Sequence, residues 1–403
     1  MTTESLRSAD AAAQFTAPAA LDRVQSLGLI AGGVGTVLMV VGLFLSRAYF
    51  FRAYLVGWVL WTGVSLGCLA IYLLHHMTRG AWGLVVRRVL EAASRILPVL
   101  FLLSLPLFGF GMGYLYEWSH PEVVRGNEVL EHKAAYLNVP FFFIRLVLYF
   151  AIWYGFAWLL NRMSLRQDRA DDPGLTRRMQ LVAGPGLVGY CLCVTFAAVD
   201  WLMSLQPHWY STIFGVYLMA SQGLSALAFL IVAAVYLSRR EPMAGVIQPR
   251  HFHDWGKLLF AFVMLWAYFA FSQFLISWAG NLPEEITYYL ARMRGGWGLV
   301  ALALVVLQFI LPFALLLSRD IKRNSGLLAA VALCVLATRW LDMFWQVEPA
   351  FHERNLAMYW LYLAAPLAIG GLWVFFFVRE LKKRPLLPLH DPYLPEAIAH
   401  EHH

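Results

Sequence analysis

The sequence predicts an all-α protein that crosses a membrane many times, in about ten transmembrane helices. Of its 403 residues, 60% are hydrophobic and 14% are charged, whereas soluble domains have roughly 25% charged residues. The apolar residues also come in long blocks, close to the ~20 residues that a helix needs to cross the hydrocarbon core. Alternating strands of about ten residues, which would indicate a β-barrel, do not describe these blocks.

Ten apolar segments are long enough to cross a bilayer, and each is predicted to be one helix. The expected spans, in chain order, are 26–46, 53–74, 96–116, 139–160, 181–204, 211–237, 256–280, 297–318, 326–346 and 357–379. A cytoplasmic tail of residues 1–25 is expected before them, because this stretch lacks the pattern of a secretory signal peptide. A second cytoplasmic tail, residues 380–403, is expected after them.

Two similar segments indicate an internal repeat. The fifth span ends in "VDWLMSLQP" and the ninth in "LDMFWQVEP", so that in each an Asp is followed seven residues later by a Pro. Four spans separate the two segments, and the two helices therefore run in the same direction. The repeat predicts two four-helix bundles, 53–204 and 211–346. Helix 1 (26–52) and helix 10 (357–379) are expected at their periphery.

The distribution of basic residues predicts the orientation. The two tails and the loops after the second, fourth, sixth and eighth spans hold about three times as many lysines and arginines as the opposite loops. Both termini are therefore expected in the cytoplasm. The net charge of +7 follows from these basic helix ends, which face anionic lipid, and nucleic-acid binding is not expected.

Four ionisable side chains lie inside the expected spans: Arg145, Asp200, Arg339 and Asp342. Such a group costs roughly 2.5–3.5 kcal/mol in the hydrocarbon on insertion scales, so it usually faces protein or a cavity. The helix directions place all four at a similar level in the periplasmic half of the membrane. Two are basic and two are acidic, so they can neutralise one another. The sequence leaves open which arginine meets which aspartate.

Two neutral residues extend these groups. Gln346 follows Arg339 and Asp342 on one helix face, and Ser204 lies one turn beyond Asp200. One interpretation is a proton-handling or quinol-binding site that opens toward the periplasm, in which a carboxylate accepts a proton and an arginine orients it. The alternative is a pair of buried salt bridges that lock the helices together.

Other polar residues are less specific. His208 and Trp209 form part of the loop after the fifth span and are expected at the outer interface, where aromatic residues anchor membrane proteins. Polar residues inside the later spans either line a hydrophilic path or form hydrogen bonds between helices. They are Ser221, Gln222, Ser225, Ser272, Gln273, Ser277 and Gln308.

The cysteines and histidines predict no cofactor or metal bound by this chain. The four cysteines lie in apolar segments, without the spacing of an Fe–S cluster or the C-x-x-C-H motif of c-type haem. No histidine lies in the middle of an expected span, so haem b is not expected either.

Three segments together resemble a known family. They are "VDWLMSLQPHWYSTIFGVYLMA", "TRWLDMFWQVEPAFHE" and the C-terminal "KKRPLLPLHDPYLPEAIAHEHH". They are similar to ActF, an NrfD-like membrane subunit of bacterial alternative complex III, which is a quinol:electron-acceptor oxidoreductase. The resemblance covers nearly the whole chain. The related ActC subunits share the motifs of the fifth and ninth spans, but the short length and the proline-rich tail favour ActF.

The resemblance implies a multi-pass subunit of a bacterial inner membrane that carries no redox centre of its own. It structures the membrane arm and conducts protons through its buried Asp and Arg groups. The implied partners are an ActC-like membrane subunit, an Fe–S subunit, multihaem cytochrome c subunits and a menaquinol or ubiquinol pool. Haem c and Fe–S clusters would then belong to the partners, and quinol or lipid could contact this chain.

Two other functions stay open from the sequence. One is the quinol-binding anchor of another NrfD-type enzyme. The other is a stand-alone secondary transporter, although transporters place their Gly/Pro helix breaks near mid-membrane. Here Pro207 and Pro349 fall at the periplasmic ends of their spans, which weakens the transporter hypothesis.

Overall fold

The computed structural model describes residues 14–78, 80–169, 172–351 and 355–399, and in these residues the secondary structure is helical. Ten helices are long and apolar enough to cross a membrane. The predicted all-α polytopic membrane fold is therefore confirmed. Parts of both expected tails, residues 1–13 and 400–403, lie outside the described residues.

The ten spans are built from long helices, some of them with a short turn at one end. They are α3 (Ala20–Leu45), α4 (Arg47–Thr78), α6 (Arg87–Ser94) with α7 (Leu97–Leu115), α10 (Val139–Gln167), α11 (Pro173–Trp201) with η2 (Met203–Leu205), α12 (Phe214–Ser238), α13 (Pro249–Gly280), α15 (Trp297–Leu304) with η3 (Val305–Ile310) and α16 (Leu311–Leu317), α18 (Ser325–Val347) with η4 (Glu348–Ala350), and η5 (Leu356–Met358) with α19 (Leu361–Leu381).

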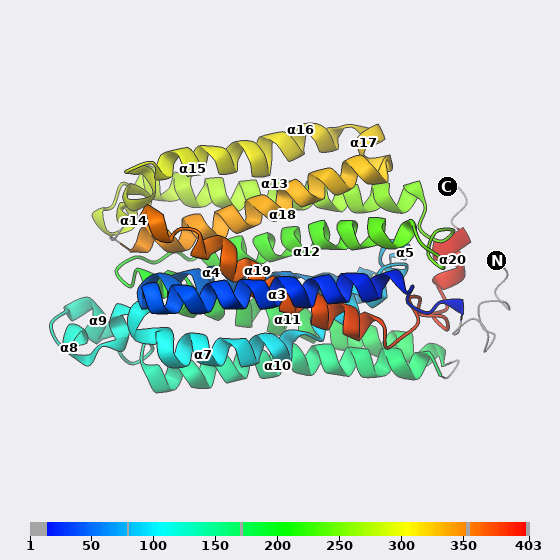
Figure 1. Cartoon of the computed structure of the whole chain (residues 1–403), viewed down its shortest axis with the longest axis horizontal. Helices are drawn as coiled ribbons and strands as arrows, with labels where there is room; N and C mark the ends of the chain where they lie inside the picture. The colour runs from blue at the N-terminus through cyan, green and yellow to red at the C-terminus, as the bar shows by residue number, and fades with distance from the viewer. Residues whose placement is uncertain (1–13, 79, 170–171, 352–354, 400–403) are drawn as a thin grey trace.

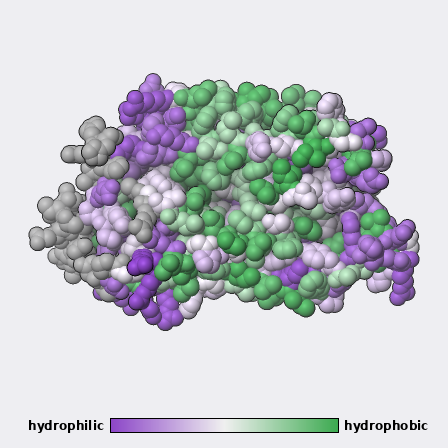
Figure 2. All heavy atoms as spheres, turned by 180° about the vertical axis from the view of Figure 1, so that it is seen from behind, coloured by the Kyte–Doolittle hydropathy of each residue, from purple (hydrophilic) through white to green (hydrophobic). Residues whose placement is uncertain are grey.

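Short helices cover the two ends of the bundle. At one end, here called the loop end, lie η1 (Glu117–Ser119), α8 (Pro121–Val124), α9 (Glu128–Lys133) and α14 (Pro283–Met293). At the other, the tail end, lie α5 (Ala81–Leu84), α17 (Arg319–Arg323) and α20 (Leu394–Ala399), and both chain termini are on this side (Figure 1). On the face shown in Figure 2, hydrophobic side chains cover the middle and hydrophilic ones gather toward both ends. This belt is what a bilayer-spanning protein presents to lipid.

The helices extend beyond the apolar segments that predict them. The third span, expected from residue 96, begins at Arg87, because its first helical turns are polar and a hydropathy pattern does not detect them. The first two spans are separated by Ser46 alone. A polar helix end needs no hydrocarbon around it, so the expected limits describe the apolar part of each span.

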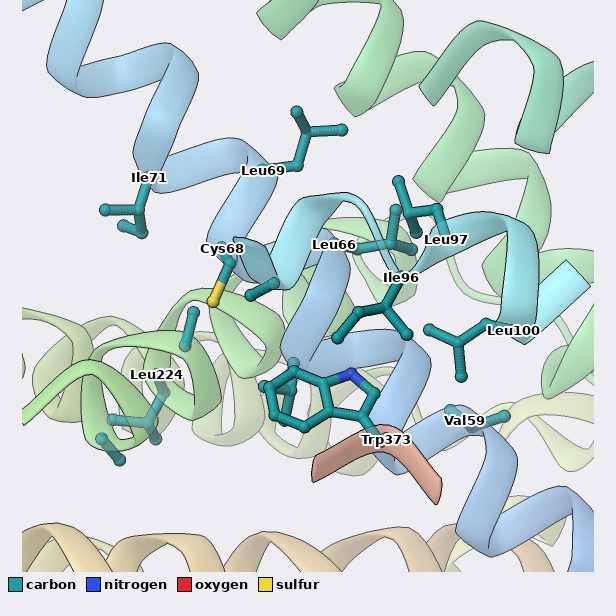
Figure 3. Close-up of a cluster of buried hydrophobic side chains, with 14 of the residues drawn as sticks. Val59, Leu66, Cys68, Leu69, Ile71, Ile96, Leu97, Leu100, Leu224 and Trp373 are labelled. Carbon is teal, nitrogen blue, oxygen red and sulfur yellow. The ribbon is translucent and has the colours of Figure 1, made fainter. Parts of the chain in front are cut away.

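Helix α4 is the most buried span and lies at the centre of the packing. It contacts α7, α11, α12 and α19. Its side chains Leu66, Cys68 and Leu69 enter a core that also contains Leu224 of α12 and Trp373 of α19 (Figure 3). Helix α12 in turn contacts α13 and α18, and α19 packs along α3. The division into two bundles with peripheral helices stays a prediction.

The crossing of α4 and α12 depends on Gly67. A Cβ at this position would lie 2.6 Å from the carbonyl carbon of Gln222 in α12, so any side chain would force the two helices apart. We expect Gly67→Ala to lower the free energy of unfolding by about 1–3 kcal/mol, as overpacking does elsewhere. Gly63→Ala is the matched control, because a Cβ there would meet only Gln222 Cγ at 3.5 Å.

Thermal melting of the purified protein in detergent would test this. Gly63→Ala should melt close to the unmodified protein and Gly67→Ala several degrees lower. Equal melting temperatures for the two variants would mean that the α4–α12 crossing tolerates a wider spacing.

The C-terminal tail packs against the rest of the protein. The backbone N–H of Leu386 donates to the carbonyl of Phe15 at 2.8 Å, and Leu386 and Leu387 are buried. Further along, the carbonyl of Ala397 in α20 lies 3.1 Å from Nε2 of His251 in α13. The tail therefore bridges the start of the chain and the later spans.

Candidate functional site

Asp200 forms a buried ion pair with Arg145 of the neighbouring helix α10. Nε and one terminal nitrogen of Arg145 donate to the two carboxylate oxygens of Asp200, both at 2.8 Å. Tyr149, one turn along α10, donates its hydroxyl to Oδ2 at 2.7 Å. A bidentate arginine–carboxylate pair is among the strongest polar contacts in proteins, and it joins α10 to the end of α11.

The loop before α10 holds Arg145 from the other side. Its second terminal nitrogen donates to the carbonyl of Tyr136 at 2.8 Å, and its guanidinium carbon lies 3.8 Å from the centre of the Tyr136 ring. Burial raises the pKa of Tyr136 to about 12, so this phenol stays protonated at neutral pH. Arg145 thus has a carboxylate, a carbonyl and a ring face as partners, which suits a buried cation.

Asp342 is the centre of a second group, whose partners come from three helices. Arg339, on the same helix α18, contacts Oδ2. The hydroxyl of Tyr217 in α12 lies 2.9 and 3.0 Å from the two carboxylate oxygens, and Trp266 Nε1 in α13 donates to Oδ2 at 3.3 Å. Gln346 Nε2 donates to Oδ1 at 3.1 Å and to the Tyr217 hydroxyl at 3.2 Å.

The structure thus shows which arginine meets which aspartate. The expected stripe of Arg339, Asp342 and Gln346 does form one hydrogen-bonded group, and all three side chains are buried. The two groups are not copies of each other. The arginine that pairs with Asp200 lies in the preceding helix α10, whereas the arginine that pairs with Asp342 lies in the same helix, α18. The repeated motif therefore places two buried carboxylates near the loop end but does not repeat their partners.

Arg292 connects the Asp342 group to the loop that follows α11. It lies in α14, is buried, and donates to the carbonyl of Gln346 at 2.6 Å and to Oε1 of Gln206 at 2.8 Å. Its guanidinium lies over Tyr288, 3.4 Å from the ring centre. Burial lowers the pKa of Arg292 from its usual value. The sequence analysis did not select this residue, because nothing in a loop sequence shows that the loop folds inward.

The remaining expected residues of this region lie close by without contacting either carboxylate. The hydroxyl of Ser204, in η2, donates to the backbone carbonyl of Asp200 at 2.6 Å. His208 is exposed, and its Nε2 lies 3.1 Å from the side-chain nitrogen of Asn127. Trp209, expected at the membrane interface, is instead buried and stacks on Tyr288 at 4.0 Å between ring centres. The side chain of Trp209 therefore holds α14 inside the protein, and the level of this loop at the membrane interface stays a prediction.

A third buried charge group, at the tail end, was not predicted. Arg87, Arg88 and Glu91 lie in α6 and are buried. Glu91 accepts hydrogen bonds from Arg87 Nε at 3.1 Å, from Arg88 at 2.7 Å and from the hydroxyl of Ser164 in α10 at 2.6 Å. Arg88 also contacts Asp168, just after α10. The group therefore joins α6 to the end of α10.

The C-terminal tail completes this group. Arg384 donates to Glu91 Oε2 at 3.1 Å, and Arg87 donates to Asp391 Oδ2 at 2.7 Å. Three arginines and three carboxylates result, so the opposite charges balance, as a buried group requires. The i, i+4 spacing of Arg87 and Glu91 was the only available sequence signal, and it lay in a stretch assigned to a loop.

Several neutral polar groups lie inside the second half of the chain. Tyr190 of α11 donates its hydroxyl to Gln222 Oε1 at 2.7 Å, which is a bond between helices. Gln308 is fully buried in the π-helical turn η3, and neither of its amide atoms has a hydrogen-bond partner in the described part of the chain. The hydroxyl of Ser221 in α12 is also buried and has no hydrogen-bond partner among the described residues. π-Turns inside helices often mark functional positions, and buried waters in proteins typically bond to polar groups that lack a protein partner.

The described residues contain no group of three or more His, Cys, Asp or Glu side chains placed to hold a metal ion. No family model matches the sequence, and no curated protein matches it either. Function is therefore inferred from the helical membrane fold and from the buried charges within it.

Proposed function

We propose that this chain is a cofactor-free membrane subunit of a respiratory quinol:electron-acceptor oxidoreductase of the alternative complex III type. It structures the membrane arm, with its termini in the cytoplasm of a bacterial inner membrane, and its Asp342 group handles protons. An ActC-like subunit, an Fe–S subunit and multihaem cytochrome c subunits would be its partners, drawing electrons from menaquinol or ubiquinol. The resemblance of three sequence segments to ActF suggests this complex.

The surroundings of Asp342 are the observation that supports proton handling best. Its carboxylate is fully buried among membrane-spanning helices, where an ionisable group is costly and usually functional. Tyr217 and Gln346 form a connected set of hydrogen bonds with it. A tyrosine hydroxyl both donates and accepts, so Tyr217 can pass a proton to Asp342 and take another from a neighbour.

The polar residues of α12 continue from this group toward the middle of the membrane. Tyr217, Ser221 and Ser225 follow one another at four-residue spacing and therefore share one helix face. The Ser221 hydroxyl has no protein partner in the described residues, so it is available to a water molecule in this proposal. On the other side, Arg292 donates to the backbone carbonyl of Gln346 and to the side chain of Gln206 at the loop end. An arginine keeps its proton, so Arg292 positions this end of the group, and protons would pass between Asp342, Tyr217 and water held by the hydroxyls of α12.

Asp200 has the other role in this proposal, that of a lock between helices. Both of its oxygens bond to Arg145 of α10, and the remaining terminal nitrogen of Arg145 is held by the backbone of Tyr136. Such a closed bidentate pair favours a fixed geometry. Of the two carboxylates that the repeated motif places near the loop end, we therefore assign proton transfer to Asp342 alone.

Two matched substitutions test this assignment in the assembled complex. Tyr217→Phe and Tyr149→Phe each remove one tyrosine hydroxyl that donates to a buried carboxylate, and neither changes the charge of the protein. Tyr217→Phe and Asp342→Asn are expected to slow quinol-driven proton movement by about 100-fold, the low end for a positioned acid–base group. Tyr149→Phe should leave it near normal. The rate of quinol-driven proton release, measured in liposomes, is the readout, and equal rates for both tyrosine variants would contradict a proton role for Asp342.

Co-purification tests the assignment to a complex. The chain, isolated gently from its membrane, is expected to bring Fe–S and multihaem cytochrome c subunits with it. A protein that purifies alone and intact, and that moves a solute across liposomes, would be a secondary transporter. Association with an NrfD-type enzyme of another class, and loss of quinol binding on substitution of Asp342, would identify a quinol-binding anchor instead.

A further inference from the structure

A cleft of about 400 Å³ opens at the tail end, between the end of α12 and the start of α18. Its walls are the apolar side chains Val232, Val235 and Ala329, and its rim holds Tyr236, Arg239 and Arg240. The walls of the cleft are therefore apolar, and its rim is cationic. A phospholipid has the same division, with apolar chains and a charged headgroup.

The two arginines are placed as a phosphate site would need them. Arg240 donates to the carbonyl of Tyr236 at 2.7 Å, and its guanidinium lies over the Tyr236 ring, 3.6 Å from its centre. Tyr236 is itself fixed, because its hydroxyl donates to the carbonyl of Ala20 at 3.1 Å. A guanidinium held in this way loses little freedom when it binds a phosphate.

Arg239 extends across the cleft toward α18. One of its terminal nitrogens lies 3.7 Å from the position that a Cβ on Gly326 would take, in the first turn of that helix. The N-terminus of a 23-residue helix adds a partial positive charge at this place. Three sources of positive potential thus converge on the rim.

The described part of the chain does not neutralise these charges. Within the described residues, no ion pair joins Arg239 or Arg240 to a carboxylate. Among the acidic residues of the adjoining segments, Asp22 of α3 pairs with Lys382, and Glu241 and Asp320 are exposed. An anion is therefore the complementary ligand, and basic pockets between membrane helices are known to bind anionic headgroups.

We propose that this cleft binds one anionic phospholipid of the phosphatidylglycerol class. The phosphate is held by Arg239 and Arg240 beside the N-terminus of α18. One acyl chain runs along Val232, Val235 and Ala329. The inference requires only that the chain lies in a membrane, and it does not depend on the proposed respiratory function.

The test uses the full chain in nanodiscs of mixed phosphatidylglycerol and phosphatidylethanolamine, followed by detergent extraction and mass spectrometry of the retained lipid. The unmodified protein is expected to retain phosphatidylglycerol in preference. The double variant Arg239→Gln/Arg240→Gln should lower that retention about 30-fold, since each basic residue near a membrane surface contributes about fivefold. The matched control is Arg177→Gln/Arg178→Gln, which removes two adjacent exposed arginines at the start of α11. It should leave retention close to that of the unmodified protein, because neither residue lines the cleft.

A second variant separates the cleft from its charge. Ala329→Trp keeps both arginines but fills the apolar groove, and it too should displace the lipid. The proposal would be overturned if Ala329→Trp left lipid retention unchanged. It would also be overturned if Arg239→Gln/Arg240→Gln and Arg177→Gln/Arg178→Gln lowered retention equally, because basic residues anywhere on the surface would then attract the lipid. Displacement of the lipid by millimolar inorganic phosphate alone would also overturn it, because the site would then recognise the free anion.

Discussion

Replacing Glu91 by glutamine is expected to prevent stable folding, and it is the most severe single change that we predict. Glu91 is fully buried and accepts hydrogen bonds from three arginines, Arg87, Arg88 and Arg384. Without its negative charge, two aspartates remain to balance three closely placed cations. Removing one partner of a single buried ion pair already costs about 3–5 kcal/mol, which is a large part of the stability of most proteins.

The measurement is the yield of folded protein in the membrane fraction, with limited proteolysis of the C-terminal tail. The tail is a sensitive reporter, because Arg384 and Asp391 attach it to this group. Asp254→Asn is the control, since Asp254 pairs with Lys257 at the surface, and such exposed pairs contribute at most about 1 kcal/mol. Equal yields for the two variants would show that the buried group is not needed for folding.

Replacing Asp200 by asparagine is expected to lower the free energy of unfolding by about 3–5 kcal/mol, because it leaves Arg145 charged and buried. The shape of the side chain is kept, so the effect measures the loss of charge. The double variant Arg145→Met/Asp200→Leu should recover most of this stability, since replacing both members of a buried pair by apolar residues is often neutral.

Unfolding of the protein in mixed micelles by increasing denaturing detergent would report these differences. A double variant as unstable as Asp200→Asn would contradict the explanation that the loss of stability comes from the unbalanced charge of Arg145. The specific geometry, rather than the charge balance, would then be what the fold needs. Replacing Asp342 alone and then together with Arg339 should recover less stability. Tyr217, Trp266 and Gln346 also lose their hydrogen-bond acceptor in those variants.

The positions of the spans and the identity of the charged residues inside them could be predicted from the sequence. An apolar block of membrane-spanning length has few alternatives to a helix, because the backbone must satisfy its own hydrogen bonds in lipid. For the same reason Asp200 and Asp342 stood out, as charges within such blocks are rare. Gln346 could be joined to Asp342 because both lie on one helix, where spacing determines which side chains meet.

The partners that come from other helices could not be predicted. Tyr217 and Trp266 reach Asp342 from α12 and α13, and no spacing rule connects residues that far apart in the chain. Trp209 shows the same limit, because an aromatic residue in a loop suits a membrane interface and a protein core equally well. Its burial depends on α14 folding back over the loop end.

The sequence by itself determined that this chain is a ten-span helical membrane protein with buried acidic groups near one end, since apolar length and helical spacing are local properties. The tertiary structure alone decided which arginine neutralises which aspartate. It also decided that Arg87, Arg88 and Glu91 lie inside the protein and that the C-terminal tail is part of that group. Each of these outcomes depends on which helices pack together. Packing is selected by the shapes of whole faces, such as the glycine crossing at Gly67, which no single segment encodes.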